Sequence, residues 1–412
     1  MVLQQHTACP VWGRAPAGSK VRVVFRGREV KTAAGTDGAW HVEVESGEAG
    51  GPFTLAVQSI ESRNFEDVMV GEVWLVSGQS NAAQLGTFEA PTDDPRGVRF
   101  HLAVGNGSKG WSTFGSCPII AWLLGHELRR RLNVPIGILC CAVGGTCIEQ
   151  WKPGPDPDAK TAGPGGAIGP AGGLYTERLS LLQPYRLRGV TWWQGESNVN
   201  NAARYLDKFQ ALIRIWRDGW GQADLPFIWV QLERVVRQGE DWWIRIADGR
   251  AAIAQAQFLA LATERTSMVV CHDITSGDLH PPQAEKCLIA TRLALAAEAL
   301  AYGKAIECSG PLPMYAQFVD GRIRIRFSHA TGLCIKANFA NAADDLYGFE
   351  LRSGEGAFAK TRAIVEGESV FISVGDLPPP YAVRYAWGPM PTANLYNAAF
   401  LPAPTFELPV EP

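Results

Sequence analysis

Ser80 stands in a Gly-Gln-Ser-Asn run directly after a short apolar segment of the chain. A serine hydroxyl is a weak nucleophile until a neighbouring base removes its proton. His280 is the candidate for that base, and the two prolines after it restrict how the chain enters the next helix. A serine and a histidine in these settings predict an enzyme that transfers or hydrolyses acyl groups.

The candidate base also needs an acid partner. A histidine acting in this way requires an acceptor on its second ring nitrogen, which fixes the tautomer and stabilises the imidazolium ion. Asp278 lies two residues before His280 and could fold back onto it within a loop. Asp273 is the competing choice, and the sequence leaves both open.

Acyl transfer further requires two or three donors for the oxyanion that develops on the carbonyl. The backbone N–H groups of Ser80 and Gly145 and the side-chain amide of Asn198 are the candidates. Glycine at position 145 would allow the backbone to approach the substrate closely. Three further polar residues are expected to support the loops around the site: Gln79, Gln194 and Glu196.

Each of these residues has a plainer interpretation when it is taken alone. A Gly-x-Ser tripeptide is usually a turn, a single histidine is usually on the surface or in a satisfied core, and Gly-Gly is usually a turn. Glu196 could be a general acid, although a hydrogen-bonding support of its loop is the commoner role. The Gly-x-Ser-x-Gly elbow of α/β-hydrolases is absent at Ser80, which disfavours that fold.

The position of the candidates in the chain strengthens the functional interpretation. Short apolar strands alternate with amphipathic helices, which predicts an α/β fold with a parallel sheet and helices on both faces. The strands are expected at 73–76, 136–141, 190–193, 227–230 and 268–271, and the helices at 117–131, 202–217, 244–262 and 282–302. Sites in such sheets form at the carboxyl ends of strands. Four of the five expected strand ends lead into candidate residues.

Both flanks of the α/β region show the alternation and turn residues of β-strands. We therefore expect an N-terminal β domain at 1–65, a catalytic domain at 66–305 and a C-terminal β domain at 306–412. Because they flank the same α/β region, we expect the two β domains to pack together as one sandwich. The Gly/Pro-rich loop at 153–173 and the pair Trp242-Trp243 are the expected walls of a sugar site.

Composition excludes several other classes of function. The 412 residues are 46% hydrophobic and 19% charged with a net charge of −3, which is typical of a globular protein. A basic stripe is absent, which argues against nucleic acid or an anionic membrane as partner. The nine cysteines form no CxxC pair and no cluster with histidine at metal spacing, so we expect no zinc or other metal site.

The chain begins without a charged region followed by an apolar core, and the number of cysteines is odd. These features predict a cytoplasmic protein as the chain stands. A periplasmic or secreted protein is the alternative if a signal peptide has been removed. No apolar run approaches the length of a membrane span.

Several of these segments resemble the sialate O-acetylesterase family of SGNH hydrolases. The segment Gly71 to Asn81 is similar to the family's Gly-Glu-Val-Trp followed by Gly-Gln-Ser-Asn. Gly144 to Trp151 is similar to its Gly-Gly-Thr with a following acidic residue and Trp. Trp192 to Asn198 and Asp278 to Pro281 resemble its Gln-Gly-Glu-Ser-Asn and Asp-x-His-Pro blocks. The resemblance extends over nearly the whole chain.

The resemblance implies a three-layer α/β/α core and a Ser-His-Asp esterase that acts on acetylated sugars without a cofactor. It implies Ser80 as nucleophile and His280 as base, with oxyanion donors on Ser80, Gly145 and Asn198. Two departures are Ala82 in place of the family's methionine and a shortened loop at 275–277, which leaves the choice between the two aspartates open. The sequence does not indicate the sugar, the hydroxyl position or the oligomeric state.

Two other functions fit part of the sequence. One is a general short-chain carboxylesterase with no preference for sugars. The other is a carbohydrate-binding protein whose hydrolase core is degenerate, although the intact Ser, Gly, Asn and His set argues against it.

Overall fold

A six-stranded parallel sheet forms the centre of the computed structural model. The structure describes residues 1–89, 92–94, 97–103, 110–156, 169–232, 247–274, 277–337, 345–388 and 393–412. The order of the central strands is β14-β13-β12-β7-β11-β9, and every neighbouring pair is parallel. The strands are β7 (Ser62–Gly78), β9 (Val98–Leu102), β11 (Ile136–Ala142), β12 (Gly189–Trp193), β13 (Phe227–Val230) and β14 (Thr266–Val269).

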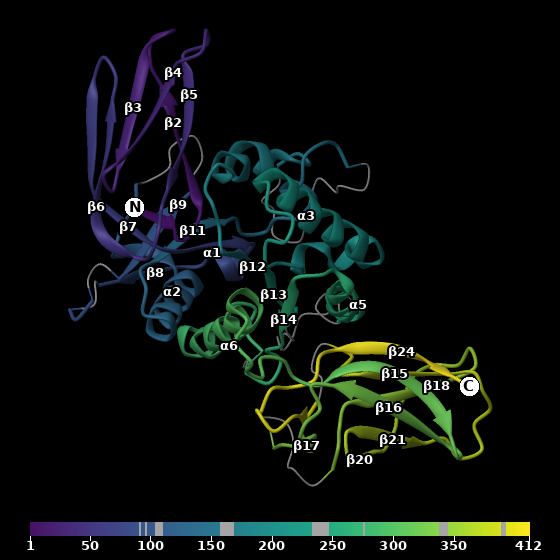
Figure 1. The fold of residues 1–412 in the computed structure, drawn as a ribbon. Coiled ribbons are helices and arrows are strands. Elements are labelled where there is room, and N and C mark those ends of the chain that lie inside the picture. Colours follow the sequence, from purple (N-terminus) through teal and green to yellow (C-terminus); the bar gives the residue numbers. More distant parts are fainter. Residues whose placement is uncertain are drawn as a thin grey trace.

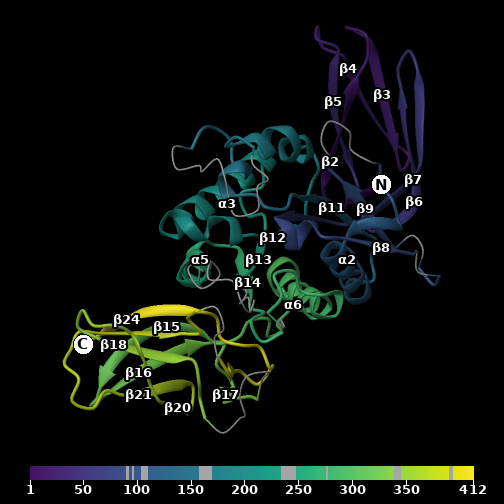
Figure 2. The same cartoon turned by 180° about the vertical axis from the view of Figure 1, so that it is seen from behind.

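Helices cover both faces of this sheet, which confirms the predicted three-layer α/β fold (Figures 1 and 2). Side chains alternate across a strand, so β7 supplies both cores. Trp74 and Val76 pack in the core beneath α2 and α6, whereas Val73 and Leu75 pack in the core beneath α3 and α5. The helices are α2 (Ile119–Leu132), α3 (Tyr205–Trp220), α5 (Ala247–Leu259) and α6 (Gln283–Tyr302).

Short helical elements connect these layers. They are α1 (Ser80–Ala83), the 3-10 helices η1 (Ile148–Trp151), η3 (Ser180–Leu182), η4 (Glu196–Arg204) and η5 (Ala260–Ala262), and the π-helical turn η2 (Tyr175–Leu179). Strands β8 (Leu85–Phe88) and β10 (Gly115–Pro118) form a small antiparallel pair. Within the described residues, no helix is long and apolar enough to cross a membrane.

The N-terminal β unit is continuous with the central sheet through β7. This strand begins at Ser62 rather than at the predicted residue 73, so the domain boundary expected at residue 65 falls inside it. The antiparallel pair β2 and β5 packs against the strands β7-β6-β3-β4 around an apolar core. The strands are β1 (Val2–Gln4), β2 (Ala8–Arg14), β3 (Lys20–Phe25), β4 (Arg28–Ala33), β5 (Ala39–Glu45) and β6 (Gly50–Gln58).

The C-terminal β unit is built around one sheet with the order β19-β18-β22-β24-β15-β16-β21-β20. Its strands are β15 (Leu312–Val319), β16 (Arg322–Ser328), β18 (Phe349–Ser353), β19 (Ala359–Lys360), β20 (Ala363–Glu366), β21 (Ser369–Ser373), β22 (Tyr381–Tyr385) and β24 (Phe406–Glu411). A small pair, β17 (Cys334–Ile335) and β23 (Leu395–Tyr396), lies beside it.

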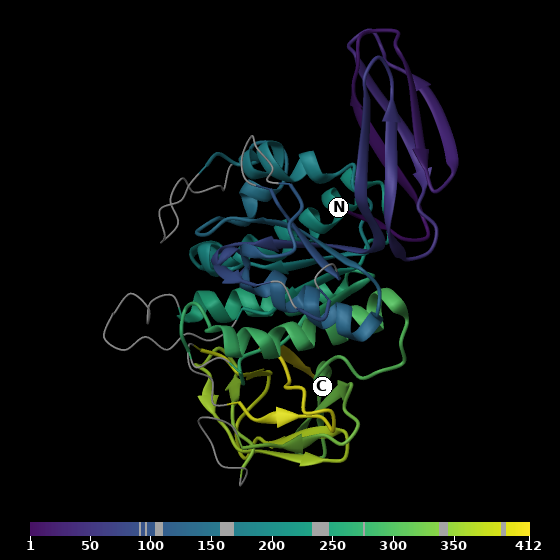
Figure 3. The same cartoon turned by 90° about the vertical axis from the view of Figure 1, so that its left-hand side faces the viewer.

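The two β units do not pack together as one sandwich, which corrects that expectation. They lie on opposite sides of the α/β layers (Figures 1 and 3). The physical reason is that the two units are attached to different parts of the α/β layers. β7 fixes the N-terminal unit to the amino ends of the central strands, whereas Gln255 on α5 exchanges two hydrogen bonds with Glu407 of β24. Gln231, directly after β13, pairs in the same way with Thr405.

Candidate active site

Ser80 lies where β7, the central strand of the sheet, turns into α1. The turn requires a glycine immediately before it. Gly78 has φ +134°, and a Cβ at this position would lie 2.1 Å from the carbonyl oxygen of Trp193 at the end of β12. The two strand ends therefore touch, and Ser80 stands half-buried at the carboxyl edge of the sheet.

The Gly-Gly turn after β11 lies beside Ser80. A Cβ on Gly144 would be 3.5 Å from the Cβ of Ser80. Gly145 has φ +71°, a left-handed conformation that favours glycine. Within the described part of the chain, neither the N–H of Ser80 nor that of Gly145 donates a hydrogen bond. Both groups are therefore available to an oxyanion.

Asn198 is held by its amide oxygen and by its amide nitrogen. Its Oδ1 accepts from the N–H of Ile148 at 3.0 Å and from Nε2 of Gln194 at 2.7 Å. Its Nδ2 lies 3.2 and 3.0 Å from the two carboxylate oxygens of Glu149. The two N–H bonds of an amide diverge widely, whereas the oxygens of one carboxylate lie close together. The two carboxylate oxygens of Glu149 therefore share one N–H of the Asn198 amide, and these contacts do not use the second N–H.

The predicted supporting glutamines join the loops of different strands. Gln79 accepts from the N–H of Ser197 at 3.3 Å through its Oε1. Gln194 donates to the carbonyl oxygen of Thr146 at 3.1 Å and accepts from the Tyr205 hydroxyl at 2.9 Å. The loop after β12 is thus tied to the nucleophile turn and to the Gly-Gly turn.

Glu196 and Asn81 connect the nucleophile to the histidine loop. Asn81 donates through Nδ2 to Oε1 of Glu196 at 3.0 Å and to the carbonyl oxygen of Leu279 at 3.1 Å. Oε2 of Glu196 is buried and has no hydrogen-bond partner among the described residues. The residue after Ser80 is therefore bonded to the residue before His280.

His280 lies exposed at the rim of this site, six residues before the buried Lys286. Partial burial lowers the pKa of His280, the positive charge of Lys286 lowers it further, and the negative charge of Glu196 opposes both. The net lowering of the pKa favours the neutral form of His280 that a general base needs. In the described structure no hydrogen bond joins His280 to Ser80; such bonds often tighten only when substrate binds.

The two candidate acids have different environments. Asp273 is mostly buried, and its two oxygens accept from the Arg292 guanidinium at 2.7 and 2.8 Å. Burial acts to raise the pKa of Asp273, but the hydrogen bonds and charge of Arg292 outweigh it and hold that pKa below its ordinary value. Asp278 is exposed and lies in the same loop as His280.

Several residues of this site were not predicted from the sequence, namely Asn81, Glu149, Lys208 and Lys286. Asn81 could have been inferred from its place directly after the nucleophile. Lys286 could not, because only the fold brings its Nζ within 3.2 Å of the carbonyl oxygen of Asn81. The expected sugar-site walls Trp242-Trp243 and residues 157–168 lie outside the described residues.

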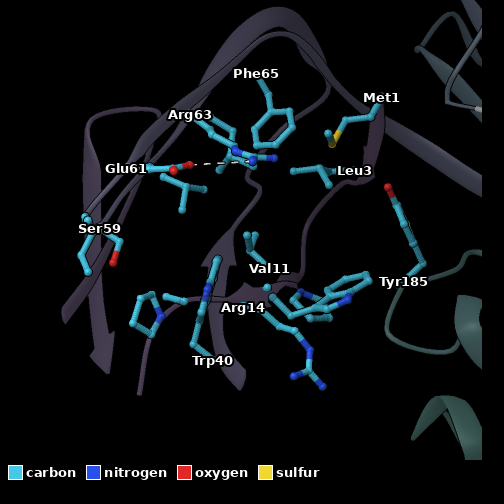
Figure 4. A pocket seen from close by; sticks show the side chains of 18 residues that line it. Met1, Leu3, Val11, Arg14, Trp40, Ser59, Glu61, Arg63, Phe65 and Tyr185 are labelled. Atoms are coloured by element: carbon cyan, nitrogen blue, oxygen red, sulfur yellow. Dashed lines mark ion pairs between the residues drawn. The ribbon is translucent and has the colours of Figure 1, made fainter. Parts of the chain in front are cut away.

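A cavity of about 690 Å³ lies in the N-terminal β unit (Figure 4). Its lining includes Met1, Leu3, Val11 and Phe65, together with Tyr185 from the α/β region. Phe65 lies near the start of β7 and Ser80 follows its end, so this cavity faces the amino ends of the strands. It contains none of the candidate catalytic residues and is remote from the chemistry.

Residues 119–297 match the family described as carbohydrate esterase, sialic acid-specific acetylesterase. The chain is 32% identical to the sialate O-acetylesterase of Pongo abelii over an alignment of 381 residues, which covers 76% of this chain and 72% of that protein. The Homo sapiens sialate O-acetylesterase has the same identity and coverage.

A solved structure from Xanthomonas citri, described as a novel carbohydrate acetylesterase, has the same fold as this chain. The TM-score is 0.83 at 30% sequence identity, and the similarity covers 98% of this chain and 96% of the Xanthomonas citri chain. The likeness therefore includes the N- and C-terminal β units as well as the central layers.

Proposed function

The chain belongs to the sialate O-acetylesterase family and is a carbohydrate acetylesterase, and on this premise we propose that Ser80 removes O-acetyl groups from a sugar through an acetyl-enzyme. The observation that carries the proposal is the position of Ser80. It stands at the end of the central strand, next to a Gly-Gly turn, with two backbone N–H groups available around it.

The reaction proceeds in two steps. His280 takes the proton of Ser80, and the serine oxygen attacks the acetyl carbonyl carbon. The carbonyl oxygen becomes an oxyanion, which the N–H groups of Ser80 and Gly145 and the unused N–H of Asn198 bind. The sugar oxygen leaves with the proton from His280. A water molecule, deprotonated by His280, then attacks the acetyl-enzyme, and acetate leaves as Ser80 regains its proton.

Asp278 is the proposed acid partner of His280. It lies two residues from the base in the same loop, whereas the carboxylate of Asp273 is already bound by Arg292. Gln79, Gln194 and Glu196 stay in the supporting roles that their hydrogen bonds give them.

The substrate class is tested by release of acetate from acetylated sialic acid, acetylxylan and acetylated xyloglucan, with the Ser80→Ala variant as control. Acetate from at least one of these, absent with the variant, is the expected result. Release from none of them, alongside rapid cleavage of simple aryl esters, would favour the general short-chain carboxylesterase instead.

Acyl-chain length gives a second, independent test of the proposed function. In a pocket shaped for an acetyl group, kcat/KM for a butyryl ester should be lower than for an acetyl ester by about 10-fold or more, because of the extra methylenes. We expect the order acetyl, butyryl, octanoyl for the 4-nitrophenyl esters, with steeply falling kcat/KM. Equal rates for acetyl and butyryl would count against an acetylesterase.

The charge of Lys286 should set the acid limb of the pH profile. Lys286 is fully buried and lowers the pKa of His280, so Lys286→Met should raise that pKa. The base then becomes protonated at higher pH, and the acid limb of kcat/KM should move to higher pH. Lys360→Met, an exposed lysine in β19, is the matched control and should leave the limb in place. If the acid limb of kcat/KM stays in place or moves to lower pH in the Lys286 variant, this role of Lys286 is contradicted.

A further inference from the structure

A buried cluster of charges lies behind the Gly-Gly turn. Glu149 is 2% exposed and Lys208 on α3 is 7% exposed. Nζ of Lys208 lies 2.7 Å from Glu149 Oε1 and 3.3 Å from Asp156 Oδ1, and Lys152 pairs with Asp156 at 2.7 Å. Among the described residues, two carboxylates and two lysines of this cluster therefore form ion pairs with one another.

Lys208 is favoured in its charged form despite its burial. Burial acts to lower the pKa of Lys208, but the hydrogen bonds and charges of Glu149 and Asp156 outweigh it and raise that pKa. Buried ion pairs are weak evidence for stability, because apolar residues of similar volume often stabilise as well or better. A role in stability alone therefore does not account for Glu149.

The contact that distinguishes Glu149 is with Asn198. Its two carboxylate oxygens share one N–H of the amide, at 3.2 and 3.0 Å from Nδ2. The opposite end of the amide is fixed by the donors Ile148 and Gln194. With the plane of the amide and one N–H fixed, the direction of the second N–H is fixed too.

We propose that Glu149 is a positioning residue that aims the second N–H of Asn198 at the oxyanion, with Lys208 holding the carboxylate in place. The inference rests on the proposed function and goes beyond it, since Glu149 touches no reacting atom. Donors fixed before the reaction stabilise the transition state without reorganisation. Loss of Glu149 should therefore lower kcat while substrate binding is little changed.

A double-mutant cycle in kcat for 4-nitrophenyl acetate tests this. Asn198→Ala should lower kcat about 10²–10³-fold, the usual effect of one oxyanion donor. Glu149→Gln should lower kcat about 10-fold or more, with KM little changed, as losses of supporting partners do. In the Asn198→Ala background, Glu149→Gln should cost almost nothing further, because the residue through which it acts is gone.

Asp156→Asn is the matched control. It removes a carboxylate from the same lysine and the same cluster but not from Asn198, so kcat should stay near wild type. If Glu149→Gln folds poorly, the pair Glu149→Gln/Lys208→Gln removes both charges together and leaves no unpaired ion. That pair should show the same fall in kcat.

Multiplicative losses in the cycle would overturn the inference, as would an unchanged kcat in Glu149→Gln or an equal loss in Asp156→Asn. The proposed function fails by a different result, namely acetate release by Ser80→Ala. If Ser80→Ala is inactive and the losses in kcat in the cycle are multiplicative, only the role of Glu149 is rejected, and the proposed function is not.

Discussion

Ser80→Ala is expected to lower acetate release from 4-nitrophenyl acetate by about 10⁴-fold or more, because removal of the nucleophile in such sites costs most of the rate enhancement. The fold should be unaffected. Ser80 is half-buried. Acetate measured by a coupled assay and the free energy of unfolding in urea check the two parts.

Ser77→Ala is the matched control, three residues earlier on β7. Ser77 is fully buried, and its hydroxyl donates to the carbonyl oxygen of Cys141 at 2.5 Å. Its loss removes one buried hydrogen bond, which should cost about 0.5–1.5 kcal/mol of unfolding free energy. Activity in the folded variant should persist. More than a few per cent of wild-type activity in Ser80→Ala would reject the nucleophile assignment.

The layers of the fold could be predicted because the spacing of apolar residues along the chain differs between strands and helices. Strand β13 coincides with the predicted 227–230, and α6 begins at Gln283, directly after the prolines that follow the candidate base. The length of β7 could not be predicted in this way. Its first residues, 62–67, are exposed on both faces and therefore carry no alternation of apolar and polar side chains.

The position of Ser80 at the site could also be predicted from the sequence, because the carboxyl ends of the strands converge in a parallel sheet. The partners of the site residues were not accessible. Glu196 lies 115 residues from Asn81, and Glu149 lies 59 residues from Lys208, so no local pattern links either pair. The placement of the two β units was likewise hidden, because it depends on side-chain pairs such as Gln255 with Glu407.

Asp278→Asn and Asp273→Asn should separate the two candidate acids. If Asp278 orients His280, its amide variant leaves the geometry intact but offers the wrong partner to the ring, and kcat should fall by about 10³–10⁴-fold. Asp278 is exposed, so the free energy of unfolding should hardly change. Initial rates and urea unfolding of the same preparation give both quantities.

Asp273→Asn should show the reverse pattern. It weakens two charge-assisted hydrogen bonds to Arg292, at a cost of about 1–3 kcal/mol in unfolding free energy, while kcat of the folded variant stays near wild type. The pKa of Asp273 is lowered in the folded state, so its stabilisation is present above the unfolded pKa and is lost as the pH falls through the folded one. The stability difference between wild type and variant should therefore shrink towards acid pH. A stable Asp273→Asn protein without activity, together with an active Asp278→Asn protein, would move the acid to Asp273. The Arg292 pair would then have to break, or be shared with the histidine, before the first step.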